Sequence, residues 1–404
     1  MHLCILTQYY PPEIGAPQAR LSELAKFMVK SGHQVTVLTA MPNYPTGQVF
    51  QGYGGFVRKE TRDGVSIIRA YIYPTKSVGM IPRLANYFSF VKSSLIVGLL
   101  LLPRHDVLIT ESPPLFLGIS GYLLSRLKRA KWIFNVSDLW PESAVNLGII
   151  GEGLPLKMSK KLERFFYCHS WLVTGQSHEI IQNINARYPD ISTHHLSNGV
   201  DIEKFKPEMK SDILSPWKAC KRYTAVYAGL HGIAQGLDQI VKAAIELERK
   251  APELQIIFIG DGAEKQQLMK DVEVNGISNI SFVGPQASET MPQIWASADI
   301  ALVPLKQYIP GAVPSKLYEA MASSVPVMLI AEGEAAKIIK DSGGGVAIQP
   351  NQIGDIVSKM VFLLNDEKSR ISMGISGRRF VELNFNRYTI LKRFTQFLEG
   401  KAHD

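Results

Sequence analysis

Lys316 and Glu319 stand one helical turn apart, directly after Pro314 and Ser315, in a segment with apolar residues at helical spacing. Proline is favoured in the first turn of a helix, so this pattern predicts a helix that starts here. The free N–H groups and the positive dipole end of a helix start attract anions, and Lys316 adds a full charge. Such a group suits a diphosphate, and a carboxylate about 5–6 Å away suits the two hydroxyls of a ribose. The alternative is an ordinary exposed ion pair.

A second pair of ionisable residues, Asp138 and Glu142, follows the apolar run 132–136. The run is predicted to be a buried strand, which places both carboxylates at its carboxyl end. A carboxylate in that position can orient a sugar hydroxyl or receive its proton. The alternative is that Asp138 only caps a helix that begins near Pro141.

Strands and helices must carry these residues to a common edge, and the sequence supplies both in alternation. Short apolar runs predict parallel strands, and the segments between several of them have helical spacing. In open α/β sheets, ligands bind at the carboxyl ends of the strands. The sequence therefore predicts two doubly wound units, with strands over residues 3–7, 35–39, 106–110, 132–136, 171–174 and 194–196, then 224–229, 254–259, 280–284, 300–303, 327–330 and 345–348.

Loops rich in small residues follow several predicted strands. Gly15, after the first strand, lets backbone approach a phosphate closely, although its turn is not a GxGxxG dinucleotide motif. The loop 230–238 can hold phosphate oxygens through N–H groups. The loop 41–47 lies on the expected binding edge, or is only a connector.

The length of 404 residues predicts two domains, and the turn-rich segment near residue 200 is the predicted boundary. The net charge of +8 lies entirely in residues 1–200, which hold 20 Lys and Arg against 12 Asp and Glu, whereas residues 201–404 hold 24 of each. This asymmetry indicates an anionic partner, such as a phosphorylated substrate or a membrane surface, or it is only a solvated basic face. No nucleic-acid motif is present, so we expect no nucleic-acid partner.

The most apolar window, 93–103, has an uninterrupted apolar part shorter than the roughly 18–20 residues that a spanning helix needs. It predicts either a core helix or a helix that dips into a bilayer face, flanked by basic residues that suit anionic lipids. Cysteines and histidines form no pattern typical of a metal site, and His194 and His195 are predicted to be structural. No secretory signal is expected at the N-terminus.

Together these residues resemble a retaining glycosyltransferase of family 4 with the two-domain GT-B fold. The motifs span nearly the whole chain: YYPPEIGA at 9–16, SGHQVTVLT at 31–39, SNGVD at 197–201, YAG at 227–229, IGDG at 259–262, FVG at 282–284 and PSKLYEAMA at 314–322. PNYPTG at 42–47 and DLWPES at 138–143 resemble a bacterial surface-polysaccharide branch that transfers N-acetyl-fucosamine-type sugars.

The resemblance implies two Rossmann-like domains that face each other across a cleft. Residues 1–200, completed by a C-terminal helix at 385–404, are the expected acceptor domain, and residues 201–384 the expected donor domain. The implied catalytic residues are Asp138 and Lys316. The implied donor-binding residues are Gly15, His231, Gly260, Asp261, Gly262, Val283, Pro314, Ser315, Lys316, Leu317 and Glu319, and the expected acceptor-binding residues are Arg20, Asn43, Tyr44 and Glu142.

The chain departs from the family pattern at two places. The family has a second glutamate eight positions before Glu319, where this chain has Gly311, and an Arg and a Lys after the YAG motif, where this chain has Leu230, His231 and Gln235. Alternatives to a transferase are therefore a nucleotide-sugar 2-epimerase of similar fold and a non-catalytic nucleotide-sugar-binding protein.

The reaction implied is transfer of an N-acetylated amino sugar from a UDP-sugar to a lipid-diphosphate-linked saccharide, for O-antigen or capsule synthesis. We expect retention of the anomeric configuration, no metal or other cofactor, and a cytoplasmic protein in peripheral contact with the anionic inner face of the cell membrane.

Overall fold

A computed structural model describes residues 1–44, 46–77, 79–146 and 153–402, which form two compact α/β units. The first unit comprises Met1–Ser197 and Ile390–Asp404, and the second comprises Asn198–Thr389. The predicted boundary lay at residue 200, three residues beyond this division. Pro45 of the predicted loop 41–47 lies outside the described residues.

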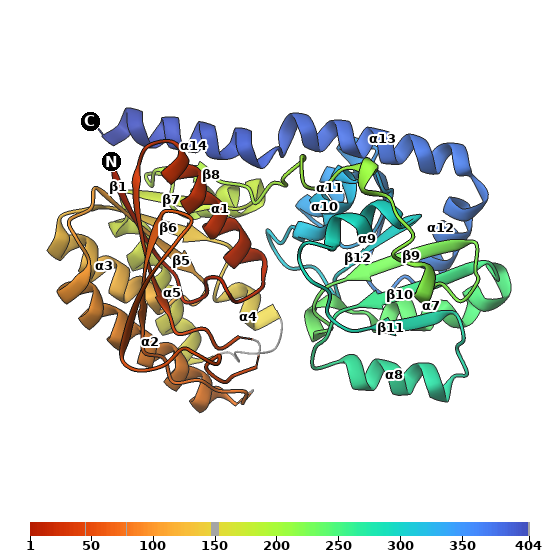
Figure 1. Cartoon of the computed structure of the whole chain (residues 1–404), viewed down its shortest axis with the longest axis horizontal. Coiled ribbons are helices and arrows are strands. Elements are labelled where there is room, and N and C mark those ends of the chain that lie inside the picture. The colour runs from red at the N-terminus through yellow and green to blue at the C-terminus, as the bar shows by residue number, and fades with distance from the viewer. Residues whose placement is uncertain (45, 78, 147–152, 403–404) are drawn as a thin grey trace. The chain divides into compact units, whose positions relative to one another are not determined.

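The first unit is built on an eight-stranded sheet in the order β3-β4-β2-β1-β5-β6-β7-β8 (Figure 1). All neighbours pair in parallel except β3 with β4. Buried apolar residues fill the central strands, as expected of a parallel sheet covered on both faces. The strands are β1 His2–Leu6, β2 Gln34–Ala40, β3 Val57–Arg62, β4 Val65–Ala70, β5 Val107–Ser112, β6 Lys131–Val136, β7 Leu172–Gly175 and β8 Thr193–His195.

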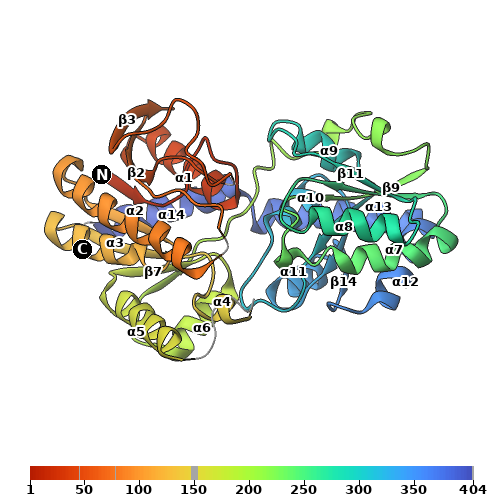
Figure 2. The same cartoon turned by 90° about the horizontal axis from the view of Figure 1, so that it is seen from below.

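Helices cover both faces of this sheet. One core contains buried side chains of α2, α3, α5 and α6, and the other contains those of α1 and α14 (Figures 1 and 2). Leu391, Phe394 and Leu398 of α14 are buried in that second core, so the end of the chain belongs to the first unit. The helices are α1 Ala16–Lys30, α2 Met80–Leu101, α3 Leu117–Lys128, α4 Glu142–Asn146, α5 Leu154–His169, α6 His178–Arg187 and α14 Arg387–Ala402.

Two elements of the first unit differ from the sequence prediction. The hairpin of β3 and β4 was not predicted, because β3 (VRKETR) is an edge strand that exposes nearly every side chain and shows no apolar alternation. Helix α2 begins thirteen residues before the predicted window 93–103. Its residues Ile81–Leu101 are long and apolar enough to cross a membrane by length and composition alone, a property shared by some core helices.

The second unit holds a six-stranded parallel sheet in the order β11-β10-β9-β12-β13-β14. Helices α9, α10, α11 and α13 pack on one face, and α7, α8 and α12 on the other. The strands are β9 Tyr223–Ala228, β10 Leu254–Ile259, β11 Ile280–Val283, β12 Ile300–Pro304, β13 Val327–Ile330 and β14 Gly345–Ile348. The helices are η1 Pro207–Met209, η2 Ser215–Trp217, η3 Ile233–Gln235, α7 Asp238–Lys250, α8 Lys265–Val274, α9 Met291–Ser297, α10 Ser315–Ala322, α11 Glu334–Ser342, α12 Ile353–Asn365 and α13 Glu367–Asn384.

Strand order reverses once in each sheet. In the first, β1 lies between β2 and β5, and in the second, β9 lies between β10 and β12. At such a switch point the loops that follow neighbouring strands run to opposite faces and leave room for a ligand at the carboxyl edge. The predicted pair of doubly wound Rossmann-like units is confirmed, and the loops after β9, β10 and β12 meet at one such edge.

Candidate active site

The start of α10 lies at the carboxyl edge of the second sheet. Leu317, Ala320 and Met321 are buried in the core and fix the helix against the sheet. Pro314 is the N-cap in an extended conformation, so it precedes the helix by one residue, whereas the sequence analysis placed it in the first turn. Among the described residues, no acceptor receives the N–H groups of Ser315 and Lys316. Both groups are therefore available to an anion.

Leu317 was predicted to bind the donor, and the structure contradicts this. Its side chain is completely buried in the core. Its N–H donates to the carbonyl oxygen of Pro314 at 3.0 Å. Neither group faces a ligand, so Leu317 anchors the helix start instead of contacting a substrate.

The side chain of Lys316 lies directly over the end of β9. A methyl group placed on Gly229 would come within 2.2 Å of Lys316 Cε and 2.8 Å of its Nζ, and Gly229 has φ +155°. Lys316 forms no ion pair with any residue that the structure describes. A glycine at the strand end thus makes the space in which an uncommitted cation sits.

Two further glycines bring the loops after β9 and β10 into backbone contact. A Cβ on Gly260 would lie 1.9 Å from the carbonyl oxygen of Gly229, and one on Gly262 would lie 2.4 Å from that of His231. The N–H of Gly260 donates to the carbonyl oxygen of Val283 at 3.0 Å. Backbone packing this close excludes side chains, so these glycines shape the floor beside Lys316.

Two residues beside these glycines contribute to the loops. Asp261 is exposed, and its carboxylate accepts the N–H of Gly262 at 2.9 Å. Val283 is buried at the end of β11 and holds Gly260 in place through its carbonyl group. Asp261 is therefore open to a ligand, and Val283 closes the floor.

His231 was predicted to share the charge of a diphosphate, and this stays a prediction; neither ring nitrogen has a hydrogen-bond partner among the described residues. The ring is fully buried and packs near Tyr227, Phe258 and Phe282, with ring centroids 5.8–6.4 Å apart. Burial lowers the pKa of His231, and the nearby Lys265 lowers it further. Its backbone joins the two glycine loops, since its N–H donates to the carbonyl oxygen of Asp261 at 2.8 Å.

Glu319 is half-buried one turn beyond Lys316. The indole N–H of Trp295 donates to its carboxylate at 3.1 Å, a contact that the sequence analysis missed. Burial raises the pKa of Glu319, while Lys316 and the Trp295 bond oppose that rise. The remaining carboxylate oxygen, Oε1, has no hydrogen bond to a described residue and can accept one from a ligand hydroxyl.

Gly311 stands where the family pattern has its second glutamate. Its φ is +74°, a conformation that costs an ordinary residue about 1–2 kcal/mol. The loop before α10 therefore takes a turn that a glutamate at this position would strain.

At the edge of the first sheet, Asp138 follows β6 and is half-buried. Burial raises its pKa, and the nearby Glu111 carboxylate raises it further, while Arg20 opposes both. The helix α4 begins only at Glu142, so Asp138 is not its N-cap. A carboxyl group with a raised pKa is closer to the range in which it exchanges protons with a substrate.

Arg20 was predicted to bind the acceptor, and the structure contradicts this. The guanidinium is buried and donates to Glu111 Oε1 at 2.5 Å and to Ser137 Oγ at 2.7 Å. Glu111 also accepts from Asn135 Nδ2 at 2.5 Å. This network, absent from the sequence analysis, holds the loop that carries Asp138.

The other predicted acceptor residues form the loop after β2 and the start of α4. Glu13, also missed, accepts the N–H groups of Asn43 at 2.9 Å and Tyr44 at 2.8 Å. The Asn43 side chain is buried and donates to the carbonyl oxygen of Met41, so it supports the loop and does not face a ligand as predicted. The Tyr44 ring remains half-exposed against Tyr9, with ring centroids 5.6 Å apart.

Glu142 and Gly15 complete the predicted set. Glu142 lies 3.4 Å from Arg187, which also binds the buried Glu163 through two bonds of 3.0 Å. Gly15 is the N-cap of α1, and a side chain there would collide with Gln18, 2.4 Å away. Glu142 is thus held in place at the edge, and Gly15 keeps the backbone open at the first switch point.

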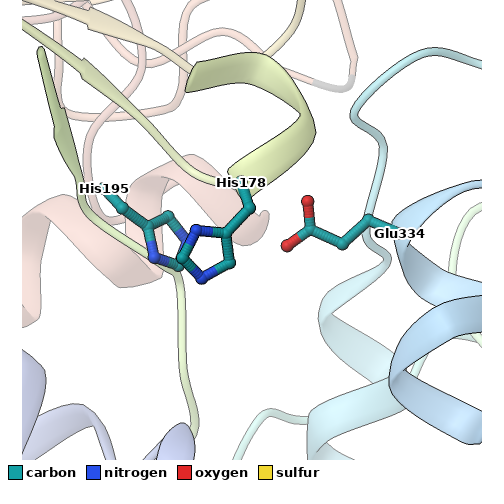
Figure 3. Close-up of side chains that lie close together, drawn as sticks. All are labelled: His178, His195 and Glu334. Carbon is teal, nitrogen blue, oxygen red and sulfur yellow. The ribbon is translucent and has the colours of Figure 1, made fainter. Parts of the chain in front are cut away.

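His195 has a partner that the sequence analysis did not foresee. Its ring lies against that of His178, with centroids 3.8 Å apart (Figure 3). Burial and His178 lower the pKa of His195 to about 4. The neighbouring His194 stacks on Phe397 of α14 instead, with centroids 4.6 Å apart. Both rings of the predicted structural pair therefore pack within the first unit.

Comparison with known families covers most of the chain. Residues 15–199 match the glycosyl transferase 4-like domain, and residues 216–380 match glycosyl transferases group 1. The "Putative colanic acid biosynthesis glycosyl transferase WcaI" of Escherichia coli K12 is 23% identical over 97% of this chain and 98% of its own length.

Two further proteins resemble the chain over its whole length. A GDP-mannose-dependent alpha-(1-6)-phosphatidylinositol monomannoside mannosyltransferase of Mycolicibacterium smegmatis is 20% identical over 99% of this chain and 98% of its own. The solved structure of Anabaena HepE in complex with UDP-glucose superposes with a TM-score of 0.74 at 16% identity, covering 99% of this chain and all of that one.

Proposed function

Because the chain is a glycosyltransferase of the GT-B fold, in which a glycosyl transferase 4-like domain precedes a group 1 domain, we propose that its second unit binds a nucleoside diphosphate sugar. The observation that carries this proposal is the uncommitted Lys316 over Gly229, beside two free N–H groups. The carboxylate of Glu319, one helical turn after Lys316, accepts hydrogen bonds from the ribose hydroxyls. HepE was solved with UDP-glucose, which supports UDP as the nucleotide.

The proposed reaction retains the anomeric configuration. The bond from the anomeric carbon to the diphosphate breaks while the acceptor oxygen bonds to that carbon on the same face. The charge that develops on the leaving diphosphate is stabilised by Lys316 and the helix start. A donor phosphate oxygen takes the proton of the acceptor hydroxyl, and Asp138 contacts the sugar near the reacting carbon. The residues of this mechanism need no metal ion.

We further propose that the acceptor is a saccharide linked to a lipid diphosphate, used to build a bacterial surface polysaccharide such as O-antigen or capsule. The relatives named for colanic acid biosynthesis and for a phosphatidylinositol acceptor support a glycan or glycolipid product. The first unit carries the excess positive charge, which supports contact with the anionic cytoplasmic face of a membrane. The sugar proposed is an N-acetylated amino sugar of the fucosamine type.

The experiment that tests this function combines a donor screen with product analysis. UDP-, GDP- and dTDP-sugars are screened for protection against thermal unfolding, and the protecting donors are incubated with lipid-linked acceptors. We expect a UDP-N-acetylamino sugar to protect, and NMR of the product to show the donor's anomeric configuration. An inverted product would contradict the retaining mechanism, and an epimerised sugar formed without acceptor would favour the epimerase instead.

A further inference from the structure

Helix α2 exposes an unusually apolar surface. Over residues 81–101 its mean hydropathy reaches 1.5, the level of a spanning segment, yet only 39% of that stretch is buried. Ile81 is 79% exposed and Leu100 is 76% exposed, and Ile96 lies between them along the exposed side. A soluble protein rarely leaves so much apolar surface in one place without a partner.

A groove lies between α2 and the two residues that flank the β3–β4 hairpin, Phe56 before it and Tyr71 after it. It encloses about 400 Å³ and is lined by Phe56, Tyr71, Ala85, Phe88, Ser89, Lys92, Ser93 and Ile96. The rings of Phe56 and Tyr71 stack nearly parallel, at 13° with centroids 6.4 Å apart, and extend its wall. The lining is mostly apolar, and its flat aromatic rings offer a surface that suits a hydrocarbon chain.

The two serine side chains of the groove already have hydrogen-bond partners. Ser89 Oγ accepts the N–H of Tyr73 at 2.8 Å, and Ser93 Oγ donates to the carbonyl oxygen of Tyr71. Asn86 Nδ2, nearby on α2, donates to the carbonyl oxygen of Tyr73 at 2.7 Å. These bonds fasten the segment after β4 to α2 and satisfy both serines of the lining.

A row of aromatic rings leads from this groove to the loop of Asp138. Phe88 lies against Phe116 with centroids 4.8 Å apart, and Phe116 lies against Trp140 at 5.8 Å. Trp140 stands two residues after Asp138. These ring contacts therefore connect the groove, within the first unit, to the loop that carries Asp138.

The charge around the groove favours an anionic head group. Residues 70–105 contain four basic residues, Lys76, Arg83, Lys92 and Arg104, and no acidic one. Lys92 lines the groove and forms no ion pair with a described residue. An occupant that is apolar along its length and anionic at one end matches both properties.

We infer that this groove holds the hydrocarbon chain of the lipid-linked acceptor, and that the aromatic row guides the chain's diphosphate end toward Asp138. The inference rests on the proposed function and names the part of the acceptor that the first unit grips. The occupant is one long chain of the substrate, distinct from the bulk hydrocarbon of a bilayer.

Photolabelling of the full-length protein tests the inference directly. The probe is a polyisoprenyl diphosphate with a diazirine in its chain, presented in detergent micelles, and labelled tryptic peptides are mapped by mass spectrometry. We expect the label mainly in peptides 70–76, 84–92 and 93–104, which contain Tyr71, Phe88 and Ile96. A label spread evenly over the exposed apolar residues, or concentrated elsewhere, would overturn the inference.

Matched variants distinguish binding of the probe in the groove from its non-specific binding to apolar surface. Phe88→Asn and Ile96→Asn should each lower the labelling about tenfold, since each places a polar group against the chain. Met158→Asn, which changes a more exposed apolar residue on α5, should leave it unchanged. Ile96→Leu should retain the labelling, because the side chain stays apolar. A loss in this variant would mean that the labelling depends on the shape of the side chain and not on its polarity. An equal loss in the Met158 variant would count against the groove.

A competition arm separates the acceptor from the bilayer. Excess phosphatidylglycerol should displace the probe weakly, whereas unlabelled polyisoprenyl diphosphate should displace it fully. Equal displacement by both would show a general membrane contact and overturn the inference. Transfer to a short-chain acceptor without labelling of the groove would leave the proposed function standing, whereas labelling without any transfer would contradict the proposed function alone.

Discussion

At the carboxyl edge of the second sheet, Lys316 lies over Gly229 without a described carboxylate as ion-pair partner, whereas at the edge of the first sheet Arg20 is buried and bonded to Glu111. A cation without an ion-pair partner, beside free N–H groups, is available to bind an anionic ligand. A cation that already holds a buried carboxylate fixes the protein's own loop. We therefore propose different roles for the two sheets: the second presents a charge that is available to a substrate, and the first holds the loop that carries Asp138.

The largest effect is expected from breaking the buried pair. Arg20→Met should lower the free energy of unfolding by about 3–5 kcal/mol, because it leaves the Glu111 carboxylate buried without its cation. Chemical denaturation measures this value. The double variant Arg20→Met/Glu111→Leu should recover much of the stability, and a double variant as unstable as the single one would show that the pair is not the cause.

A second prediction concerns the position of Lys316, which a substitution at Gly229 would displace without changing the lysine itself. Gly229→Ala should lower kcat about 10²-fold, because the added methyl group occupies the place of Lys316 Cε and displaces the cation. Gly284→Ala is the control, since a methyl group there meets nothing within 4 Å. Steady-state kinetics decide between them, and a Gly229 variant with the activity of the control would contradict the position we give to Lys316.

Glu319 is expected to have a smaller effect, on binding. Glu319→Gln should raise the KM for the donor about tenfold, since it weakens a charge-assisted bond to ribose while it retains an acceptor for Trp295. The exposed Glu289→Gln is the control. Inhibition by 2′,3′-dideoxy-UDP should be the same in wild type and variant, and a persistent difference would mean that Glu319 does not contact the hydroxyls.

The smallest effect is a pH dependence at Asp138. Because its pKa is raised in the folded state, the folded protein keeps the proton to higher pH than the unfolded chain does. Stability therefore falls as the pH rises from the ordinary aspartate range through the raised pKa. Relative to Asp138→Asn, the wild type should lose stability over that window. Thermal unfolding between pH 3 and 8 measures the difference, and parallel curves for both proteins would contradict it.

The sequence predicted the strands well, because buried parallel strands are continuous apolar runs such as 254–259. It also located the start of α10, where proline and apolar spacing agree. It could not show that glycines of two loops, after β9 and after β10, lie beside Lys316, since that contact joins residues far apart in sequence. It missed β3, because nearly all side chains of this strand are exposed and its sequence therefore shows no alternation of apolar and polar residues.

Burial of polar residues was the main feature of the site that the sequence did not show. His231 and Arg20 are polar residues in predicted loop and helix positions, and nothing local distinguishes a buried one from an exposed one. The partners that hold them, Phe258 for one and Glu111 for the other, come from other strands. The same holds for Glu13, whose carboxylate binds backbone thirty residues away.

The central claim is that Lys316 stabilises the departing diphosphate, and turnover of Lys316→Ala tests it most directly. Its kcat should fall about 10²–10³-fold, as for the loss of one preorganised electrostatic donor, while Lys337→Ala, an exposed lysine of α11, should match the wild type. Near-normal turnover in the Lys316 variant, with the nucleotide still bound, would contradict the account.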